Sequence, residues 1–130
     1  MSKKIRKGIK RKVKTLSVIG FTEKVTVYGP KKSKQAIARV DTGAAKNSID
    51  VKLAAELKLG PIIRTKKVRS AEGLSNRPLI KAGLQIGGRK FKTLFNLADR
   101  SKLRYKVLIG RNILKQRFII DPNYKKNKKK

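Results

Sequence analysis

Residues 38–44 read Ala-Arg-Val-Asp-Thr-Gly-Ala, and this is the most specific pattern in the chain. Alternating apolar and polar residues predict a β-strand over Ala36–Val40. The strand ends directly in an acidic residue, a hydroxyl residue and a glycine, which are Asp41, Thr42 and Gly43. This combination at the end of a strand makes Asp41 the first candidate for a chemical role.

A second informative stretch lies near the other end of the chain. Residues 107–114 read Val-Leu-Ile-Gly-Arg-Asn-Ile-Leu, an apolar run followed by Gly110. The run predicts a strand over Lys106–Ile109, and a short helix is predicted at Arg111–Lys115. Three further segments complete the pattern, at residues 77–80, 99–105 and 117–122.

Together these stretches resemble a known family. The first resembles the active-site loop of aspartic proteases, and the second resembles the apolar segment, glycine and short helix of retropepsins. The further segments resemble the retropepsin-like family that is associated with ATP-grasp ligases and was once labelled ATP-dependent zinc proteases, here in an archaeal-looking, highly basic version. The resemblance covers Val18–Pro122. It implies a mainly β fold, a small retropepsin-like closed β-barrel with one or two short helices and basic terminal extensions.

Zinc chemistry is not expected. The chain contains neither His nor Cys, so the commonest nitrogen and sulfur ligands of zinc are missing. The His that the family usually carries shortly after its Asp-Thr-Gly motif is replaced by Asp50. We therefore expect no metal and no cofactor, which leaves only the aspartic chemistry of the family.

The resemblance also implies how that chemistry would be arranged. Aspartic catalysis uses two carboxylates that share one proton, and this chain supplies one such motif. A peptidase would therefore be a homodimer that pairs Asp41 with its symmetry mate, while Thr42 and Gly43 fix the carboxylates through hydroxyl and backbone hydrogen bonds. The flap over the substrate would come from about Lys66–Pro78. Alternatively, the turn is retained only because its hydrogen bonds close the barrel.

Short apolar or alternating runs separated by Gly and Pro predict seven strands in all. They are Leu16–Ile19, Lys24–Tyr28, Ala36–Val40, Pro78–Ile86, Phe91–Leu97, Lys106–Ile109 and Phe118–Ile120. Two glycines, Gly87 and Gly88, lie between two of these runs and predict a hairpin. A helix is predicted at Ser48–Leu59, where apolar residues share one face and Gly60-Pro61 ends it.

The chain is strongly basic, with a net charge of +30 on 130 residues. Residues 1–15 hold eight of the 37 Lys and Arg, residues 123–130 hold five, and neither segment contains an acid. Subtracting these leaves 24 basic residues against all seven acids, so residues 16–122 alone carry +17. We therefore divide the chain into a basic N-terminal extension (1–15), a barrel (16–122) and a basic C-terminal tail (123–130).

A polyanionic partner would neutralise this charge and reduce the repulsion within the chain. No apolar run is long enough to span a membrane and no signal peptide is visible, so we expect a cytoplasmic, ribosome-associated protein without membrane partners. Recognition is expected through phosphates and shape. The candidate RNA-binding residues lie in both tails, one loop and one body segment: Lys3, Lys4, Arg6, Lys7, Lys10, Arg11, Lys12, Lys14, Lys31, Lys32, Lys34, Arg64, Lys66, Lys67, Arg69, Lys125, Lys126, Lys128, Lys129 and Lys130.

These observations support two main hypotheses. The first is a ribosomal or ribosome-associated structural protein that binds rRNA on a retropepsin-like scaffold, with ribosomal RNA and neighbouring ribosomal proteins as partners. The second is a homodimeric aspartic endopeptidase that uses Asp41. Other polyanion binders, including DNA-binding or chromatin-like proteins, form a third class.

Overall fold

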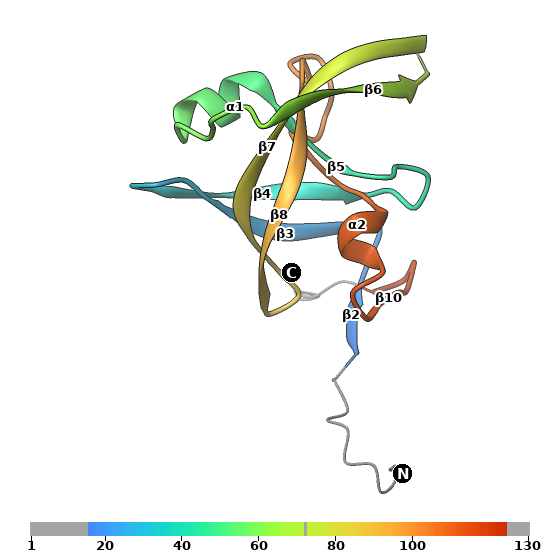
Figure 1. The fold of residues 1–130 in the computed structure, drawn as a ribbon. Coiled ribbons are helices and arrows are strands. Elements are labelled where there is room, and N and C mark those ends of the chain that lie inside the picture. Colours follow the sequence, from blue (N-terminus) through green and yellow to red (C-terminus); the bar gives the residue numbers. More distant parts are fainter. Residues whose placement is uncertain (1–15, 72, 125–130) are drawn as a thin grey trace, which may run out of the picture.

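The computed structural model describes residues 16–71 and 73–124, which form a mainly β structure with two short helices (Figure 1). The elements in chain order are β2 (Ser17–Ile19), β3 (Thr22–Tyr28), β4 (Ser33–Val40), β5 (Asn47–Asp50), α1 (Val51–Glu56), β6 (Arg64–Ser70), β7 (Gly73–Ile86), β8 (Arg89–Ala98), β9 (Val107–Ile109), α2 (Arg111–Leu114) and β10 (Phe118–Ile120). No helix in these two described ranges is long and apolar enough to cross a membrane.

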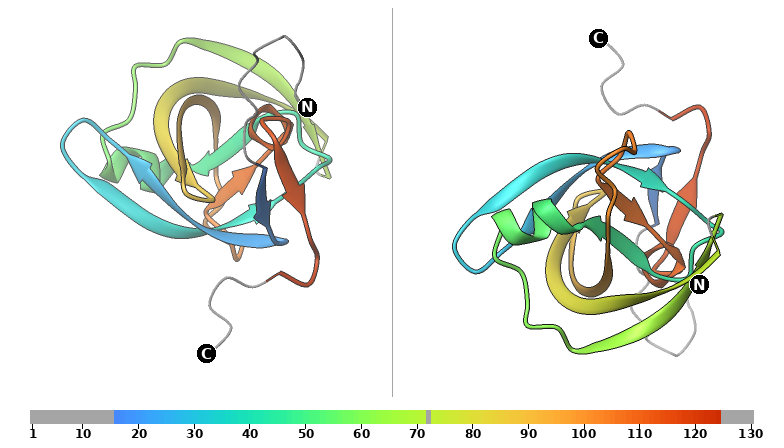
Figure 2. Two further views of the ribbon diagram at one scale, coloured as in Figure 1. Left: turned by 90° about the horizontal axis from the view of Figure 1, so that it is seen from below. Right: turned by 90° about the horizontal axis from the view of Figure 1, so that it is seen from above.

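The main sheet closes on itself. Its strands follow the order β3-β4-β9-β5-β8-β7, and β7 pairs back onto β3 through contacts such as Val27 with Leu84. Figure 2 shows the ribbon from below and from above, and in both views the strands wind around a common interior. The strand β6 pairs only with β7 and extends the sheet beyond the ring. The expected mainly β closed barrel is therefore confirmed.

One feature of the topology decides where the loop after β4 lies. The strands β4 and β5 follow each other in the chain, but β9 is inserted between them. It runs parallel to β4, with Ala38 opposite Val107, and antiparallel to β5, with Ile49 opposite Val107. Residues 41–46 must therefore cross the carboxyl end of β9 to connect its two neighbours.

Apolar side chains that alternate along the strands fill the barrel. Val25 and Val27 on β3, Leu84 on β7 and Phe95 on β8 are almost completely buried. Full burial of one such side chain contributes about 1.5–3 kcal/mol, so this interior is the main source of stability. The chain contains no Cys, so disulfides add nothing to it.

Two hairpins shape the rest of the barrel. Gly87 and Gly88 both have positive φ, at 58° and 78°, which is the backbone of the tight turn predicted between β7 and β8. The second hairpin joins β6 to the first half of β7, with Lys66 opposite Arg77. It extends past the barrel on the side where the loop after β4 lies (Figures 1 and 2).

The structure corrects three assignments. The helix predicted at Ser48–Leu59 is shorter, because Asn47–Asp50 form β5 and α1 covers only Val51–Glu56. All four residues of β5 are buried between β8 and β9, so pairing in the sheet overrides their helical pattern. Arg64–Ser70 was not predicted as a strand because its residues are mostly polar, and β7 begins at Gly73 rather than Pro78.

Candidate active site

The strand β4 places Asp41 at the edge of the barrel. Ala38 and Val40 are buried and anchor the strand, and the amide of Val40 donates a hydrogen bond to the carbonyl of Phe21 at 2.8 Å. The amide of Asp41 donates to the carbonyl of Ile109 at 2.9 Å, which continues the pairing with β9 by one residue. Asp41 itself is half-buried, at the point where the chain turns away from the sheet.

The carboxylate of Asp41 has a fixed orientation. The amide of Gly43 donates to Oδ1 of Asp41 at 2.8 Å, and the amide of Ala44 donates to the carbonyl of Asp41 at 3.2 Å. Thr42 is exposed and accepts a hydrogen bond on its carbonyl from Nη1 of Arg111 at 3.0 Å. Within the described ranges the Thr42 hydroxyl has no hydrogen-bond partner. Of the predicted contacts, the structure contains the one from the Gly43 backbone.

The segment after β9 supports this loop. The amide of Arg111 donates to the carbonyl of Ala44 at 2.8 Å. Gly110 lies so close to the loop that a Cβ atom there would be 2.5 Å from the carbonyl oxygen of Lys46 and 2.9 Å from that of Ala44. Only glycine fits this position without a shift of the backbone. The two motifs that stand out in the sequence are thus in direct contact.

Asn47 connects three strands behind the loop. It is fully buried, and its Oδ1 accepts a hydrogen bond from the amide of Gly110 at 3.0 Å. Its Nδ2 donates to the carbonyl of Leu94 at 3.0 Å. Asn47 was not among the site residues predicted from the sequence. A polar residue in the mixed polar and apolar stretch Asn47–Asp50 is a weak signal.

Asp50 has a structural role. It is only 4% exposed, and its two oxygens accept hydrogen bonds from the amides of Lys52, at 3.2 Å, and Arg100, at 2.7 Å. The first contact caps the amino end of α1. Within residues 16–71 and 73–124, no group of three or more acidic, His or Cys side chains could hold a metal ion. The residue at the family's usual His position therefore serves the fold.

Arg100 places a second charge near Asp41. It is 8% exposed, and its Nε donates to the carbonyl of Tyr105 at 2.8 Å. Burial lowers the pKa of Arg100, as does the neighbouring charge of Arg77, while Asp50 and Asp41 act in the opposite direction. The surroundings of Asp41 are thus cationic. Arg100 lies in the family-like segment 99–105 but was not predicted to belong to this site.

A closed β-barrel in which an Asp-Thr-Gly loop packs against an apolar segment ending in glycine is the retropepsin-like arrangement. The sequence model of the family described as RimB-like, "Retropepsin-like aspartic endopeptidase RimB", matches residues 52–130. This is more than half of the chain, so the chain belongs to this family. The matched range begins after Asp41 and includes Gly110.

Solved structures show the same fold. One of them is the crystal structure of Lpg0085, a protein of unknown function (DUF785) from Legionella pneumophila subsp. pneumophila str. Philadelphia 1. It has a TM-score of 0.60 and 19% sequence identity, and the match covers 85% of this chain and 96% of that chain. The comparison with curated proteins found no relative.

The seven predicted RNA-binding residues that the structure describes lie on two separate parts of the sheet, the β3–β4 hairpin and β6. Lys31 and Lys32 are exposed on the turn between β3 and β4, and Nζ of Lys34 forms an ion pair with Glu56 at 3.1 Å. On β6, a separate set of exposed cations comprises Arg64, Lys66, Lys67 and Arg69. The remaining ones lie outside the described residues: Lys3, Lys4, Arg6, Lys7, Lys10, Arg11, Lys12, Lys14, Lys125, Lys126, Lys128, Lys129 and Lys130.

Proposed function

We propose that this chain is an aspartic endopeptidase that acts as a homodimer, with Asp41 of each copy as the catalytic residue. The observation that carries the proposal is the geometry of the loop. One oxygen of the Asp41 carboxylate is fixed by the Gly43 amide, and the loop itself is held against Gly110 and α2. A carboxylate held on a rigid support in this way is suited to catalysis.

The chemistry needs a second carboxylate. In a pair that shares one proton, the ionised carboxylate removes a proton from a water molecule, and the protonated one donates its proton to the carbonyl oxygen of the substrate. The water oxygen then bonds to the carbonyl carbon, and collapse of this intermediate releases the amine with a proton from the pair. Asp50 cannot be the partner, because amides of the fold occupy both of its oxygens. The symmetry mate of Asp41 can supply it.

The two-stranded sheet of β2 and β10 supports an association of two copies. Val18 and Ile119 are paired neighbours, and both are more than 40% exposed. Phe21, which follows β2, is 59% exposed. The strands β2 and β10 lie on the side of the barrel that also bears α2 and the loop after β4 (Figure 1). A second copy seated here would cover apolar surface and complete the catalytic pair.

Charge favours an acidic substrate. Arg77 and Arg100 both belong to the charged surroundings of the site, and β6 adds exposed cations on the hairpin that extends past the barrel. Cations around a cleft raise the local concentration of anionic ligands. Peptides with Asp or Glu near the cleaved bond should therefore be preferred.

The test is to compare the chain with its Asp41→Asn variant on casein and on a proteome-derived peptide mixture between pH 3 and pH 7. Cleavage products are read by mass spectrometry. We expect wild-type cleavage and its loss in Asp41→Asn. Glu56→Gln makes the same change of carboxylate to amide on exposed α1 and should retain activity. Equal product patterns from wild type and Asp41→Asn would rule the proposal out.

A second function is favoured by a different observation, the excess charge of the whole chain. We propose that the basic extensions and the cations of the barrel bind ribosomal RNA through its phosphates, and that the protein associates with ribosomes, in an archaeal cell, next to ribosomal proteins. Residues 16–122 alone carry a net charge of +17, which favours a polyanionic partner. Sedimentation of a native cell extract tests this. We expect co-sedimentation with ribosomes at low salt and release at high salt, whereas recovery only in the free fraction at low salt would refute the association.

A further inference from the structure

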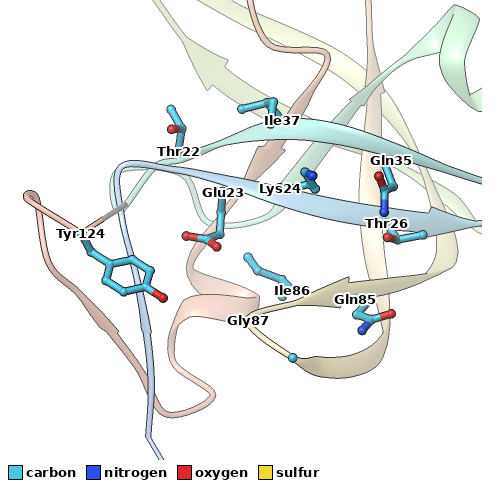
Figure 3. A pocket seen from close by; sticks show the side chains of 11 residues that line it. Thr22, Glu23, Lys24, Thr26, Gln35, Ile37, Gln85, Ile86, Gly87 and Tyr124 are labelled. Atoms are coloured by element: carbon cyan, nitrogen blue, oxygen red, sulfur yellow. The ribbon is translucent and has the colours of Figure 1, made fainter. Parts of the chain in front are cut away.

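An open groove of about 430 Å³ lies away from Asp41, between the β3–β4 hairpin, the turn between β7 and β8, and the last described residue (Figure 3). None of the residues that line it belongs to the loop of residues 41–46. The volume is within the range of about 300–1,000 Å³ that is usual for small-ligand sites. The groove therefore needs an explanation separate from the peptidase site.

Tyr124 forms one end of the groove and is held in place there. The amide of Tyr124 donates to the carbonyl of Asp121 at 2.9 Å, and the amide of Asn123 donates to Oδ1 of Asp121 at 3.0 Å. The amide of Asp121 in turn donates to the carbonyl of Ile19 at 2.8 Å. A turn fixed at three points thus presents an aromatic ring, whose face can stack on a planar ligand.

Glu23 supplies a carboxylate next to this ring. It is 7% exposed, and its Oε1 accepts a hydrogen bond from the amide of Gly20 at 3.1 Å. Within residues 16–71 and 73–124, its Oε2 has no hydrogen-bond partner. Figure 3 shows Glu23 and Tyr124 pointing toward the same part of the groove. The free oxygen of Glu23 is therefore a hydrogen-bond acceptor that favours a ligand with hydrogen-bond donors.

The opposite end of the groove is also polar and partly fixed. The Tyr28 hydroxyl donates to Oε1 of Gln85 at 2.7 Å, which leaves the Gln85 amide nitrogen free to donate. Gln35 and exposed Lys24 line the same groove. A ligand that carries hydrogen-bond donors on a flat ring, next to a phosphate, would match the Tyr124 ring, the Glu23 carboxylate and Lys24.

We propose that this groove binds an unpaired guanine base of single-stranded RNA. The inference rests on the proposed RNA-binding function and gives it a base-specific contact. Guanine offers two neighbouring donors on one edge, N1–H and the N2 amino group, and the free Oε2 of Glu23, which has two lone pairs, can accept from both. Uracil, cytosine and adenine each place a carbonyl or ring-nitrogen acceptor beside their donor, which a carboxylate repels. Tyr124 stacks on the base, and the exposed Lys24 contacts a neighbouring phosphate.

The experiment measures binding of fluorescent eight-nucleotide RNAs by anisotropy at 0.3 M salt, where phosphate contacts are weakened. The RNAs are oligo-U and the same sequence with one central G, A or C. We expect the G-containing RNA to bind about tenfold more tightly than oligo-U. Glu23→Gln should abolish this preference, although the variant loses a negative charge that repels RNA. Glu56→Gln, which removes the same charge on α1, should retain the preference.

Tyr124→Leu provides a second variant at the end of the described chain, and thermal unfolding shows which variants fold. We expect Tyr124→Leu to bind the G-containing RNA about tenfold more weakly than wild type. Equal wild-type affinity for all four RNAs, or tighter binding of the G-containing RNA by Glu23→Gln, would overturn the base site and leave phosphate binding intact. Failure to bind any RNA at 0.05 M salt would instead refute the RNA-binding function itself.

Discussion

At the scale of single residues, the carboxylate of Asp50 connects the helix α1 to the segment after β8 through hydrogen bonds. It accepts hydrogen bonds from the amides of Lys52, on α1, and Arg100, in the segment after β8, which lie 48 residues apart in the chain. The second of these amides belongs to Arg100, whose side chain lies in the charged surroundings of Asp41. Asp50 therefore positions the site without taking part in its chemistry.

Replacing this carboxylate should weaken the fold. Asp50→Ala removes a helix cap and leaves a buried amide without an acceptor, which together should cost about 2–4 kcal/mol of unfolding free energy. Asp50→Asn keeps one acceptor oxygen and should cost less. Urea unfolding measures both values, and an Asp50→Ala variant as stable as wild type would show that these contacts contribute nothing.

Gly110 allows a direct test of the contact between the two sequence motifs. In Gly110→Ala the new Cβ would lie 2.5 Å from the carbonyl oxygen of Lys46, so the loop must shift. We expect the unfolding free energy to fall by about 1–3 kcal/mol. Peptide cleavage should also fall strongly, because Asp41 shifts with the loop. In the matched control Gly43→Ala, the Cβ would meet only Oδ1 of Asp41, at 3.2 Å, so a smaller loss of stability is expected. Equal stability of the two variants would contradict this explanation.

Only part of this site can be predicted from the sequence. Asp41, Gly43 and Gly110 belong to short contiguous motifs, and the structure brings these motifs together. Asn47 and Arg100 could not be assigned, because their roles depend on partners that only the folded topology brings near. The amide that Asn47 binds is sixty-three residues away in the chain.

At the scale of elements, the strands with alternating apolar residues were predictable and β5 was not. The four residues of β5 are all buried between two neighbours, so they carry no alternation to distinguish a strand from the start of a helix. The strand β6 was missed for the opposite reason. It is a largely exposed, cationic edge strand, and its pairing with β7 is visible only in the structure.

The sheet of β2 and β10 allows a test of the proposed dimer interface. Ile119→Glu places a charge on its exposed apolar face, so the fold should persist while the dimer dissociates at least tenfold more readily. Sedimentation equilibrium measures the change. Ile62→Glu makes the same substitution at an exposed residue outside this sheet and should leave the dimer unchanged. Dissociation by Ile62→Glu alone would place the interface elsewhere.

At the scale of the whole molecule, net charge acts in opposite directions on the two proposed associations. Two copies of the chain bring together twice +30, so repulsion opposes the dimer and salt should strengthen it. RNA binding releases counterions and should weaken with salt. Between 0.05 and 0.5 M salt we expect dimer affinity to rise and RNA affinity to fall, each by tenfold or more. If dimer affinity and RNA affinity changed in the same direction with salt, the opposite effects of net charge on the two associations would be contradicted.

The central claim is that one active site needs Asp41 from two copies of the chain, and subunit mixing tests it most directly. Wild type and Asp41→Asn are mixed at a fixed total concentration, allowed to exchange, and assayed for peptide cleavage. If both carboxylates are required, activity follows the square of the wild-type fraction and falls to about a quarter in an equal mixture. Activity that falls in proportion, to about one half, would contradict the claim, because each copy would then act on its own.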